Sequence, residues 1–538
     1  MTATLTAGPA ARRKAPSALR SGALMAAGSL VSRATGFVRA AVVAAALGAG
    51  LVADGYAVGN SVPTIVYMLL LGGALNAVFV PELVKAAKEH EDGGAAYTDR
   101  LLTLCALALA VLTAGAVLAA PALVDAYTDY AGGQRDLTIA FTRACLPQIL
   151  FLGLFTLLGQ VLNARGRFGA MMWTPVLNNV VVVAVFGLFL AVSDGGELTP
   201  GETALLGWGT TAGIAAQALA LLPSLRAARF RFRPRFDWRG SGLTAPLRAA
   251  GWLVLLVLTN QAAYWVTTWV ATSAGGETHT GGAGLAAYNN AYLLWAVPHG
   301  IVTVSLVTAL MPRMSGAAAD GDLAAVRRDV GYAQRTTAAA VVPAACALFA
   351  LAAPLMTVVF GYGATDAADV RAMAWTLMAL APGLVALSGQ YVCTRAFYAL
   401  RDTRTPFLLN LVIAGLNALL SLAAHHWLPT RWTVTGMAAG YSLALWAGWA
   451  LTGYVLRRRL PAADGGGDGL GRLLLAALPA AGYGLFAAET TASAGAVVSG
   501  LSGAVAVLAT FALLARPLRL TEVSALLTAS AARLTRRS

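Results

Sequence analysis

The chain has 538 residues, of which 58% are hydrophobic and only 12% are charged, and its formal net charge is +14. Soluble globular chains carry roughly 25% charged residues, so the surplus of apolar surface must face lipid. This excludes a soluble enzyme. The basic residues also lie in short loops between apolar segments rather than in one solvated patch, so no nucleic-acid partner is expected.

Apolar segments of about 20 residues, the length that crosses a hydrocarbon core of roughly 30 Å, recur along the whole chain. They predict an all-α polytopic membrane protein with about 14 transmembrane helices. The first span is expected to be retained, because no short apolar region with a cleavage site follows the basic N-terminal residues. The expected spans lie near residues 22–48, 56–84, 101–124, 137–163, 171–193, 203–225, 249–273, 284–312, 336–360, 372–399, 406–428, 434–456, 473–488 and 495–515.

Two arginines, Arg33 and Arg39, lie in the first span. A guanidinium that faces lipid at the membrane centre costs about 2.5–3.5 kcal/mol, so both side chains are expected to face a watery cavity. On an ideal helix they point about 120° apart. Their forked donors match phosphate oxygens, which makes both candidate diphosphate ligands. The alternative is a structural role, in which Arg33 reaches the interface or pairs with another residue.

Amide side chains recur in the later spans, and most of them are expected to hydrogen-bond neighbouring helices. Asn289 and Asn290 follow Tyr288 at the start of the eighth span and are candidate contacts for a sugar or a phosphate. No paired carboxylates, zinc-protease motif or nucleotide-binding loop occurs, and the four cysteines are scattered singly. The sequence therefore predicts a transporter without a catalytic site, a metal or a cofactor.

Loop charge predicts the orientation of the chain. Basic residues gather on one side, at Lys85, Lys88, Arg100, Arg165, Arg167, Arg226 to Arg239, Arg313, Arg327, Arg328, Arg401, Arg404 and Arg457 to Arg459. The opposite side carries Asp54, Asp125, Asp129, Asp194, Glu197, Glu202, Glu277, Asp366 and Glu489. By the positive-inside rule, both termini are expected in the cytoplasm.

An internal repeat predicts the domain organisation. Gly159-Gln160 precedes Thr174-Pro175 as Gly389-Gln390 precedes Thr405-Pro406, an offset of about 230 residues. Each copy holds an even number of spans, so the copies are expected to be related by an axis along the membrane normal. The expected parts are a cytoplasmic N-terminal segment (1–21), two six-helix lobes (22–230 and 240–459), a cytoplasmic linker (460–472), a terminal helix pair (473–515) and a cytoplasmic basic tail (516–538).

The segment from Ser29 to Leu83 resembles the start of the MurJ/MviN lipid II flippases. The motifs that carry the resemblance are Ser32-Arg33, Gly36-Phe37, Arg39, Gly48-Ala49-Gly50, Asp54, Pro63 and Phe79-Val80-Pro81, followed later by Ala309 to Arg313 and Leu400 to Thr403. The resemblance covers nearly the whole chain. It implies two lobes around a cationic cavity, with a terminal helix pair that shapes a groove for the lipid tail, as in multidrug/oligosaccharidyl-lipid/polysaccharide exporters.

The resemblance also implies roles for particular residues. Arg33 and Arg39 match the family's first-helix arginines, and Asp54 matches an acidic residue that is a candidate for gating or coupling. Tyr67 and Leu293 stand where many members carry arginine. Acidic residues that would support sodium coupling are missing from the spans 249–273 and 406–428, which favours the membrane potential as the driving force.

The function implied is a lipid II flippase of the bacterial inner membrane that works by alternating access. Its expected partners are lipid II, membrane lipids, and proteins of cell-wall synthesis and division. Two alternatives remain open: export of another polyprenyl-linked glycan or a drug on the same fold, and a non-transporting scaffold for cell-wall enzymes.

Overall fold

The computed structural model describes residues 18–68, 92, 94–165, 167, 169–237, 251–278, 284–461 and 468–520. The side chains of residues 18–26, 251–254, 276–278 and 468 are outside this description. The predictions for residues 1–17, the end of the second span (69–84), the centre of the linker (462–467) and most of the basic tail (521–538) therefore fall outside the described residues.

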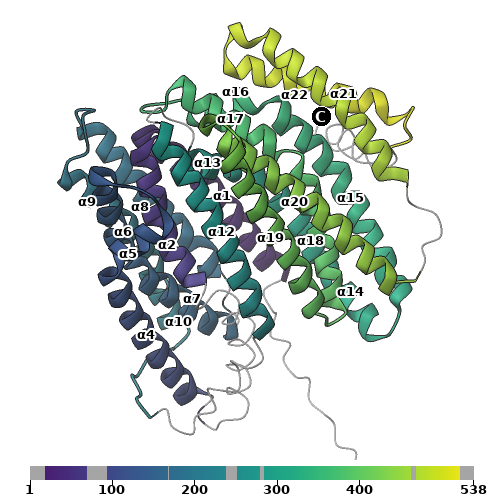
Figure 1. Ribbon diagram of the computed structural model, residues 1–538. Coiled ribbons are helices and arrows are strands. Elements are labelled where there is room, and N and C mark those ends of the chain that lie inside the picture. The colour runs from purple at the N-terminus through teal and green to yellow at the C-terminus, as the bar shows by residue number, and fades with distance from the viewer. Residues whose placement is uncertain are drawn as a thin grey trace, which may run out of the picture.

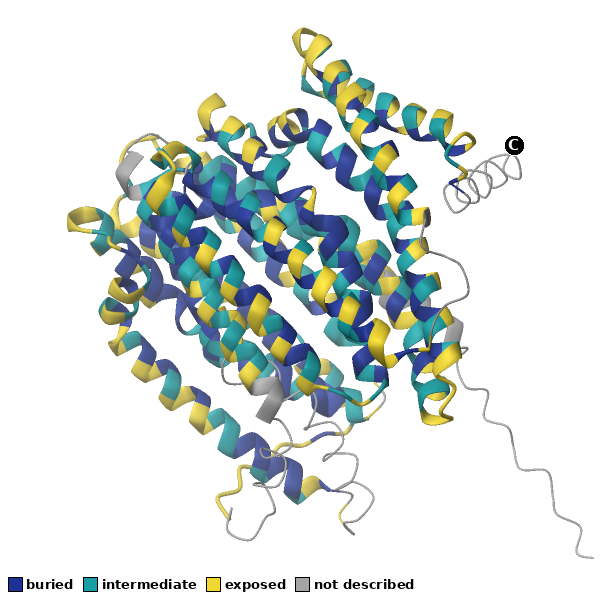
Figure 2. Ribbon diagram, turned by 45° about the vertical axis from the view of Figure 1, so that its right-hand side comes forward, coloured by how far each residue is buried: buried dark blue, intermediate teal, exposed yellow. Residues whose placement is uncertain are grey.

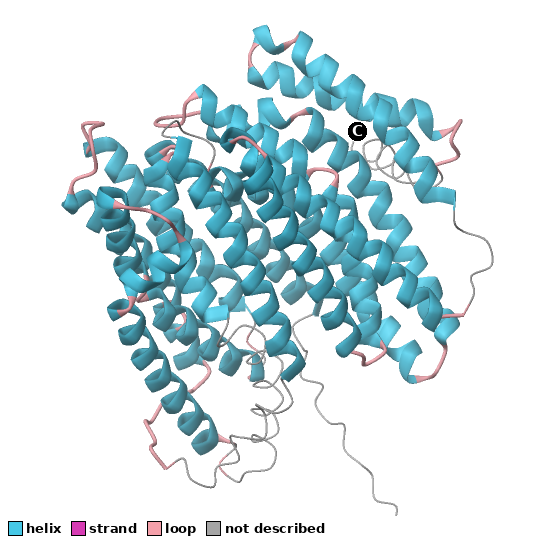
Figure 3. Cartoon of the chain, in the orientation of Figure 1, coloured by secondary structure: helices cyan, strands magenta, loops and turns pink. Residues whose placement is uncertain are grey.

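All regular elements of the described chain are helices (Figure 3), which confirms the predicted all-α class. The first half contains α1 (Ala18–Leu47), α2 (Leu51–Tyr67), α4 (Ala95–Leu118), α5 (Ala120–Tyr127), α6 (Gly132–Cys145), α7 (Gln148–Ala164), α8 (Gly169–Val192), α9 (Pro200–Leu219) and α10 (Leu222–Ala227). The second half contains α12 (Gly251–Thr278), α13 (Leu285–Pro298), the π-helix η2 (His299–Thr303), α14 (Val304–Ala319), α15 (Leu323–Ala350), α16 (Ala352–Phe360), α17 (Ala367–Leu380), α18 (Gly383–Ala399), α19 (Arg404–Trp427) and α20 (Thr430–Arg459). The last elements are α21 (Asp468–Thr490), the short 3₁₀-helix η3 (Ala492–Ala494) and α22 (Ala496–Ala515).

Local sequence explains several helix starts. Thr199 and Glu202 form a capping box at the start of α9, and Asp366 and Asp369 do the same at α17. Each pair satisfies backbone N–H groups that have no partner within the helix. α21 begins at Asp468, so the end of the predicted linker at residue 472 is placed too late. The polar, glycine-rich composition of this segment lowers its hydropathy but does not prevent helix formation.

Nine helices of the described chain are long and apolar enough to cross a membrane, or eleven if two bent helix pairs each count as one span. The bent pairs are α15 with α16 (75°) and α17 with α18 (45°). Each of the predicted spans coincides with a helix or with consecutive helices, although the second is described only as far as Met68. A polytopic membrane protein is confirmed, and the full count of fourteen spans stays a prediction.

The two halves of the chain lie side by side (Figure 1), and corresponding helices of the two halves have corresponding neighbours. In the first half α1 packs on α8, α8 on α9, α6 on α9, α2 on α6 and α4 on α7. The corresponding pairs in the second half are α12 with α19, α19 with α20, α17 with α20, α13 with α17, and α15 with α18. The same order of neighbours is what a duplicated helical unit would produce.

The terminal pair α21 and α22 packs on the outer side of the second half, against α15 and α16 (Figure 1). Large apolar side chains of this pair remain exposed, among them Leu478, Phe486 and Leu513. Exposed and buried residues alternate along the helices (Figure 2), and many of the exposed ones are large and apolar. Such a pattern fits a surface in contact with lipid rather than with water.

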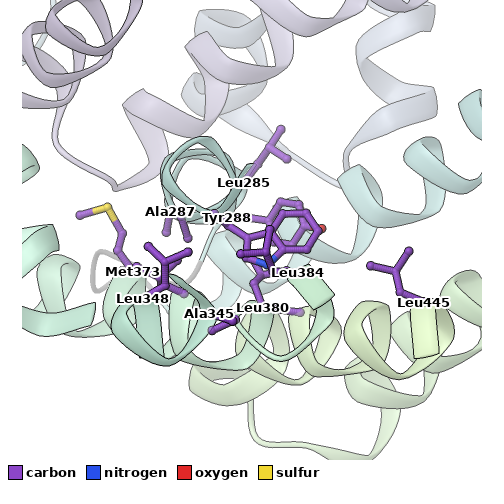
Figure 4. Close-up of a cluster of buried hydrophobic side chains, with 14 of the residues drawn as sticks. Leu285, Ala287, Tyr288, Ala345, Leu348, Met373, Leu380, Leu384 and Leu445 are labelled. Atoms are coloured by element: carbon purple, nitrogen blue, oxygen red, sulfur yellow. The ribbon is translucent and has the colours of Figure 1, made fainter. Parts of the chain in front are cut away.

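The largest core cluster extends through both halves, from Val58 and Val62 of α2 to Trp295 of α13 and Leu445 of α20. Figure 4 shows its part around α13, where Tyr288 packs beside Leu380 and Leu384. One side of α13 is therefore fixed in the second half. The opposite side is left to face the first half.

Candidate functional site

The first helix carries the two arginines and is held in place by α8. The side-chain amide of Asn179 donates to the carbonyl oxygen of Ser32 at 3.1 Å and to Oγ1 of Thr35 at 3.0 Å. These bonds fix the rotation of α1 on either side of Arg33. They also confirm, for Asn179, the predicted role of amides as contacts between helices.

Arg33 is exposed, and its guanidinium group lies against the second half of the molecule. A Cβ atom added to Gly300 would lie 2.7 Å from Nη1 of Arg33, so a larger residue at this position would push the guanidinium group away from its present place. Gly300 belongs to η2, the π-helical turn between α13 and α14. Turns of this kind interrupt α-helices and are frequent at functional sites.

Arg39 points into the first half instead. Its positive charge interacts with the phenol oxygen of Tyr56, and that oxygen lies 2.9 Å from Oγ1 of Thr210. The Tyr56 ring is enclosed edge-on by Phe141 and Phe186. The two arginines therefore have different surroundings, as the predicted angle between them requires.

Asp54 is buried where α2 of the first half meets the start of α13 in the second. Its Oδ1 accepts a hydrogen bond from the backbone N–H of Ala286 at 2.7 Å, and its buried Oδ2 has no hydrogen-bond partner among the described residues. A carboxylate at this position satisfies free N–H groups and meets the positive end of the helix dipole. A Cβ atom on Gly284 would lie 1.7 Å from Oδ2 of Asp54, so this contact requires glycine at position 284.

A second contact between the halves closes the end of α1. The carbonyl of Ala44 accepts from the Thr365 hydroxyl at 3.0 Å, and the carbonyl of Ala45 accepts from the Ala364 N–H at 2.8 Å. The N–H of Ala49 donates to Oδ2 of Asp369 at 3.3 Å. The loop between α16 and α17 thus caps a helix of the other half.

Both contacts lie at the same end of the molecule, where α1 ends and α2 and α13 begin. We call this pair of contacts, made by Asp54 with Gly284 to Ala286 and by Ala44 to Ala49 with Ala364 to Asp369, the latch. At the opposite end, the close packing of α14 is with α15, α18 and η2, all of which belong to the second half. The structure is therefore closed at the latch end.

The two asparagines predicted as substrate contacts face different surroundings. The amide of Asn290 lies 3.7 Å from the sulfur of Met373 on α17, within the second half. Asn289 is half-buried, and its amide makes no hydrogen bond to the residues that the structure describes. Tyr67 stands where related chains carry arginine. Its hydroxyl oxygen lies 2.5 Å from Oγ1 of Thr156. Leu293 is half-buried on α13.

The sequence did not indicate the partners of these residues. Gly284 has no side chain from which a contact could be predicted. It is, however, the N-cap residue of α13 and cannot cap that helix itself, so a side chain from another helix has room to do so. Thr365 and Ala364 lie more than 300 residues from α1 in sequence. In the part of the chain described here, no group of three His, Cys, Asp or Glu side chains could hold a metal ion.

Comparison with known proteins places the chain in one family. The family described as "Lipid II flippase MurJ" matches residues 43–506. A lipid II flippase MurJ of Burkholderia cenocepacia is 30% identical over 386 residues, which cover 70% of this chain and 72% of the relative.

Solved structures agree on the fold. A lipid II flippase MurJ in an inward closed conformation superposes with a TM-score of 0.74 at 16% identity, covering 92% of this chain and 99% of that one. An inward-facing multidrug-resistance transporter of the MATE family gives a TM-score of 0.56 at 15% identity, over 81% of this chain and 94% of the other. From the extent of the sequence match, the chain belongs to the lipid II flippase MurJ family.

Proposed function

We propose that this protein moves lipid II from the inner to the outer leaflet of the bacterial cell membrane by alternating access between its two six-helix lobes. The observation that carries the proposal is the position of Arg33. Its guanidinium belongs to one half of the molecule, contacts the other half at Gly300, and remains exposed. A cation held between two halves that move relative to each other suits an anionic cargo that must be taken up and released.

Arg33 is the primary diphosphate ligand in this scheme. Guanidinium offers planar, paired donors that match phosphate oxygens, and its charge is less costly when an anion is present. Arg39 is a second candidate, although diphosphate would have to compete with its interaction with Tyr56. Asn289 and Asn290 supply amides for the polar headgroup, and Asn289 is the better placed because it has no hydrogen bond to the described residues.

Asp54 serves as the gate at the outer end. Opening that end requires its carboxylate to give up the hydrogen bond from the Ala286 N–H at the start of α13. The loop between α16 and α17 must release the end of α1 at the same time. With both termini cytoplasmic, the latch faces the outside, and the basic loops face the cytoplasm.

An alternative cargo is a different polyprenyl-diphosphate glycan. Tyr67 and Leu293 favour it, because the arginines of many relatives are missing from these two positions. The membrane potential would drive either cargo, since its phosphates are charged. A role as a scaffold that binds cell-wall synthesis proteins is a further alternative, which a transport assay separates from both.

The test is transport by purified protein in vesicles that contain fluorescent lipid II. The wild-type protein should expose the lipid on the opposite leaflet, and Arg33→Ala should reduce the rate by at least about tenfold, the effect of losing roughly 1.4 kcal/mol of ligand interaction. Arg33→Lys should retain part of the rate, because lysine keeps the charge without the planar fork. Arg371→Ala removes an exposed arginine of α17 and serves as the control. Transport that survives Arg33→Ala unchanged would exclude this residue as the diphosphate ligand.

A further inference from the structure

We propose that the accessible face of α13 between the Arg33 contact and the latch is a saccharide subsite, in which Tyr292 forms the stacking surface and Asn289 the hydrogen-bonding group. This inference rests on the proposed function, because it takes a saccharide linked to the diphosphate that Arg33 binds. It deepens that function by assigning a site to the sugar.

The face is defined by the helical positions of Asn289, Tyr292, Leu293, Ala296 and Gly300. On an ideal helix they fall within a sector of about 100°. All five residues are accessible or half-buried, whereas the other side of α13, with Ala287, Ala291 and Trp295, is fully buried in the second half.

This face is turned toward the first half of the molecule. Arg33 of α1 contacts it at Gly300, and Asp54 of α2 contacts the backbone at its other end. α1 and α13 are not among the helix pairs that pack closely on each other, and the long side chain of Arg33 reaches Gly300 from α1. We infer that the face opens toward the space between the halves, because both of its ends contact helices of the first half.

The ring of Tyr292 is held by aromatic neighbours. Tyr288 stacks on it with centroids 6.2 Å apart and planes 28° apart, and Trp295 lies at 5.1 Å. Its hydroxyl interacts with that of Tyr441 of α20. Although that hydroxyl lies deep among the helices, 37% of the residue is accessible.

A fixed aromatic ring beside a free amide is suited to a carbohydrate. The C–H face of a pyranose is apolar and packs on an aromatic ring, while its hydroxyl groups require hydrogen-bonding partners. Asn289 offers such a partner one turn away from Tyr292. Leu293, which stands where relatives carry arginine, adds apolar surface instead of charge.

The order of groups along α13 matches that of the proposed cargo. Asn289 lies about 16 Å along the helix from Gly300, at 1.5 Å per residue, and Tyr292 lies between them. A diphosphate at Arg33 would therefore place its saccharide beside Tyr292 and Asn289. The latch prevents the headgroup from passing farther.

The test compares two ligands, lipid II and undecaprenyl diphosphate without a sugar, for binding to the full-length protein in nanodiscs. Tyr292→Ala should weaken the binding of lipid II by about five- to tenfold, the range expected for loss of an aromatic contact, and leave the binding of undecaprenyl diphosphate unchanged. Tyr292→Phe should bind both lipids as the wild type does, because it keeps the ring. Asn289→Ala should show the same selectivity as Tyr292→Ala.

Arg33→Ala should weaken the binding of both ligands, and Tyr332→Ala, which changes an exposed tyrosine of α15, should affect neither. Equal loss of both ligands in Tyr292→Ala, or unaltered lipid II binding in both Tyr292→Ala and Asn289→Ala, would overturn the saccharide subsite alone. A wild-type protein that binds neither lipid would overturn the proposed function together with this inference.

Discussion

Three arginines, Arg229, Arg401 and Arg519, have positive φ angles of 53°, 59° and 50°, and they are the only non-glycine residues of the described chain in that region. Each follows the last turn of a helix, where glycine is the usual residue. At Arg229 the bonds that close the turn run from the Phe230 N–H to the Leu225 carbonyl and from the Arg229 N–H to the Arg226 carbonyl. A side chain there costs backbone strain that a glycine avoids, while the positive charge interacts favourably with the helix end.

Arg229→Gly is therefore expected to raise the free energy of unfolding by about 0.5–1 kcal/mol at high ionic strength, where salt screens the lost charge interaction. The measurement is thermal unfolding in detergent. Gly321→Ala is the matched control, because Gly321 closes the end of α14 with the same pair of hydrogen bonds at a φ of 75°. This variant should be less stable than the wild type. A loss of stability in Arg229→Gly at high salt would contradict the strain argument.

Arg39 provides a second prediction at this scale. Arg39→Ala should abolish transport while the protein remains inserted, and Arg39→Lys should restore only part of it, because lysine lacks the planar fork. Growth of cells that depend on this protein, at matched membrane abundance, measures the effect. Equal growth of the arginine, lysine, glutamine and alanine versions would show that Arg39 contributes no required contact.

At the scale of elements, the latch depends on how closely α2, α13 and the end of α1 approach one another. Both of its contacts engage backbone groups at helix ends, most of which have no partner within their own helices, although the Ala44 carbonyl also accepts from the Gly48 N–H. When the halves separate, these backbone groups can form hydrogen bonds with water instead. The latch is therefore stable while water is excluded, and its opening costs little free energy. Because the capping groups belong to the other half, the hydrogen bonding of these helix ends depends on how close the two halves are.

Gly284→Ala should prevent the latch from closing, because the added Cβ atom would lie 1.7 Å from Oδ2 of Asp54. In that variant a cysteine introduced at Asn289, below the latch, should react with a membrane-impermeant thiol reagent added from outside. The four native cysteines are buried or half-buried. Gly133→Ala, where the structure leaves open space for a Cβ atom, is the control. If the cysteine remains protected in Gly284→Ala, Gly284 is not needed for closure.

At the scale of the whole molecule, the basic residues and the latch define two different ends. The segment that follows α10 carries Arg231, Arg233 and Arg235, all exposed, and is fixed to the start of α4 by the Arg100–Asp237 ion pair. The loop before α9 is acidic, with Asp194 and Glu197. This asymmetry predicts the orientation in the membrane.

Cysteines placed at Arg231 should stay unlabelled when an impermeant reagent is added to intact cells, and cysteines at Glu197 should react. Permeabilised cells provide the control, since both positions should then be labelled. Labelling at Arg231 with protection at Glu197 would reverse the orientation.

Much of the architecture was determined by the sequence itself. Hydropathy and helix length are local properties, so apolar segments predicted the helices, and the positions of Arg33 and Arg39 predicted that they point in different directions. The repeated Gly-Gln and Thr-Pro motifs indicated a duplication, and the two halves pack their helices in the same order.

Only the tertiary structure decided what these residues touch. Arg33 meets Gly300, Asp54 meets Ala286, and the end of α1 meets Thr365, all pairs separated by more than 200 residues in sequence. The partners are mainly glycines and backbone groups, which carry no side-chain pattern from which a contact can be inferred. The fold follows from local composition, whereas the site follows from close approach between the two halves, which depends on the packing of the whole molecule.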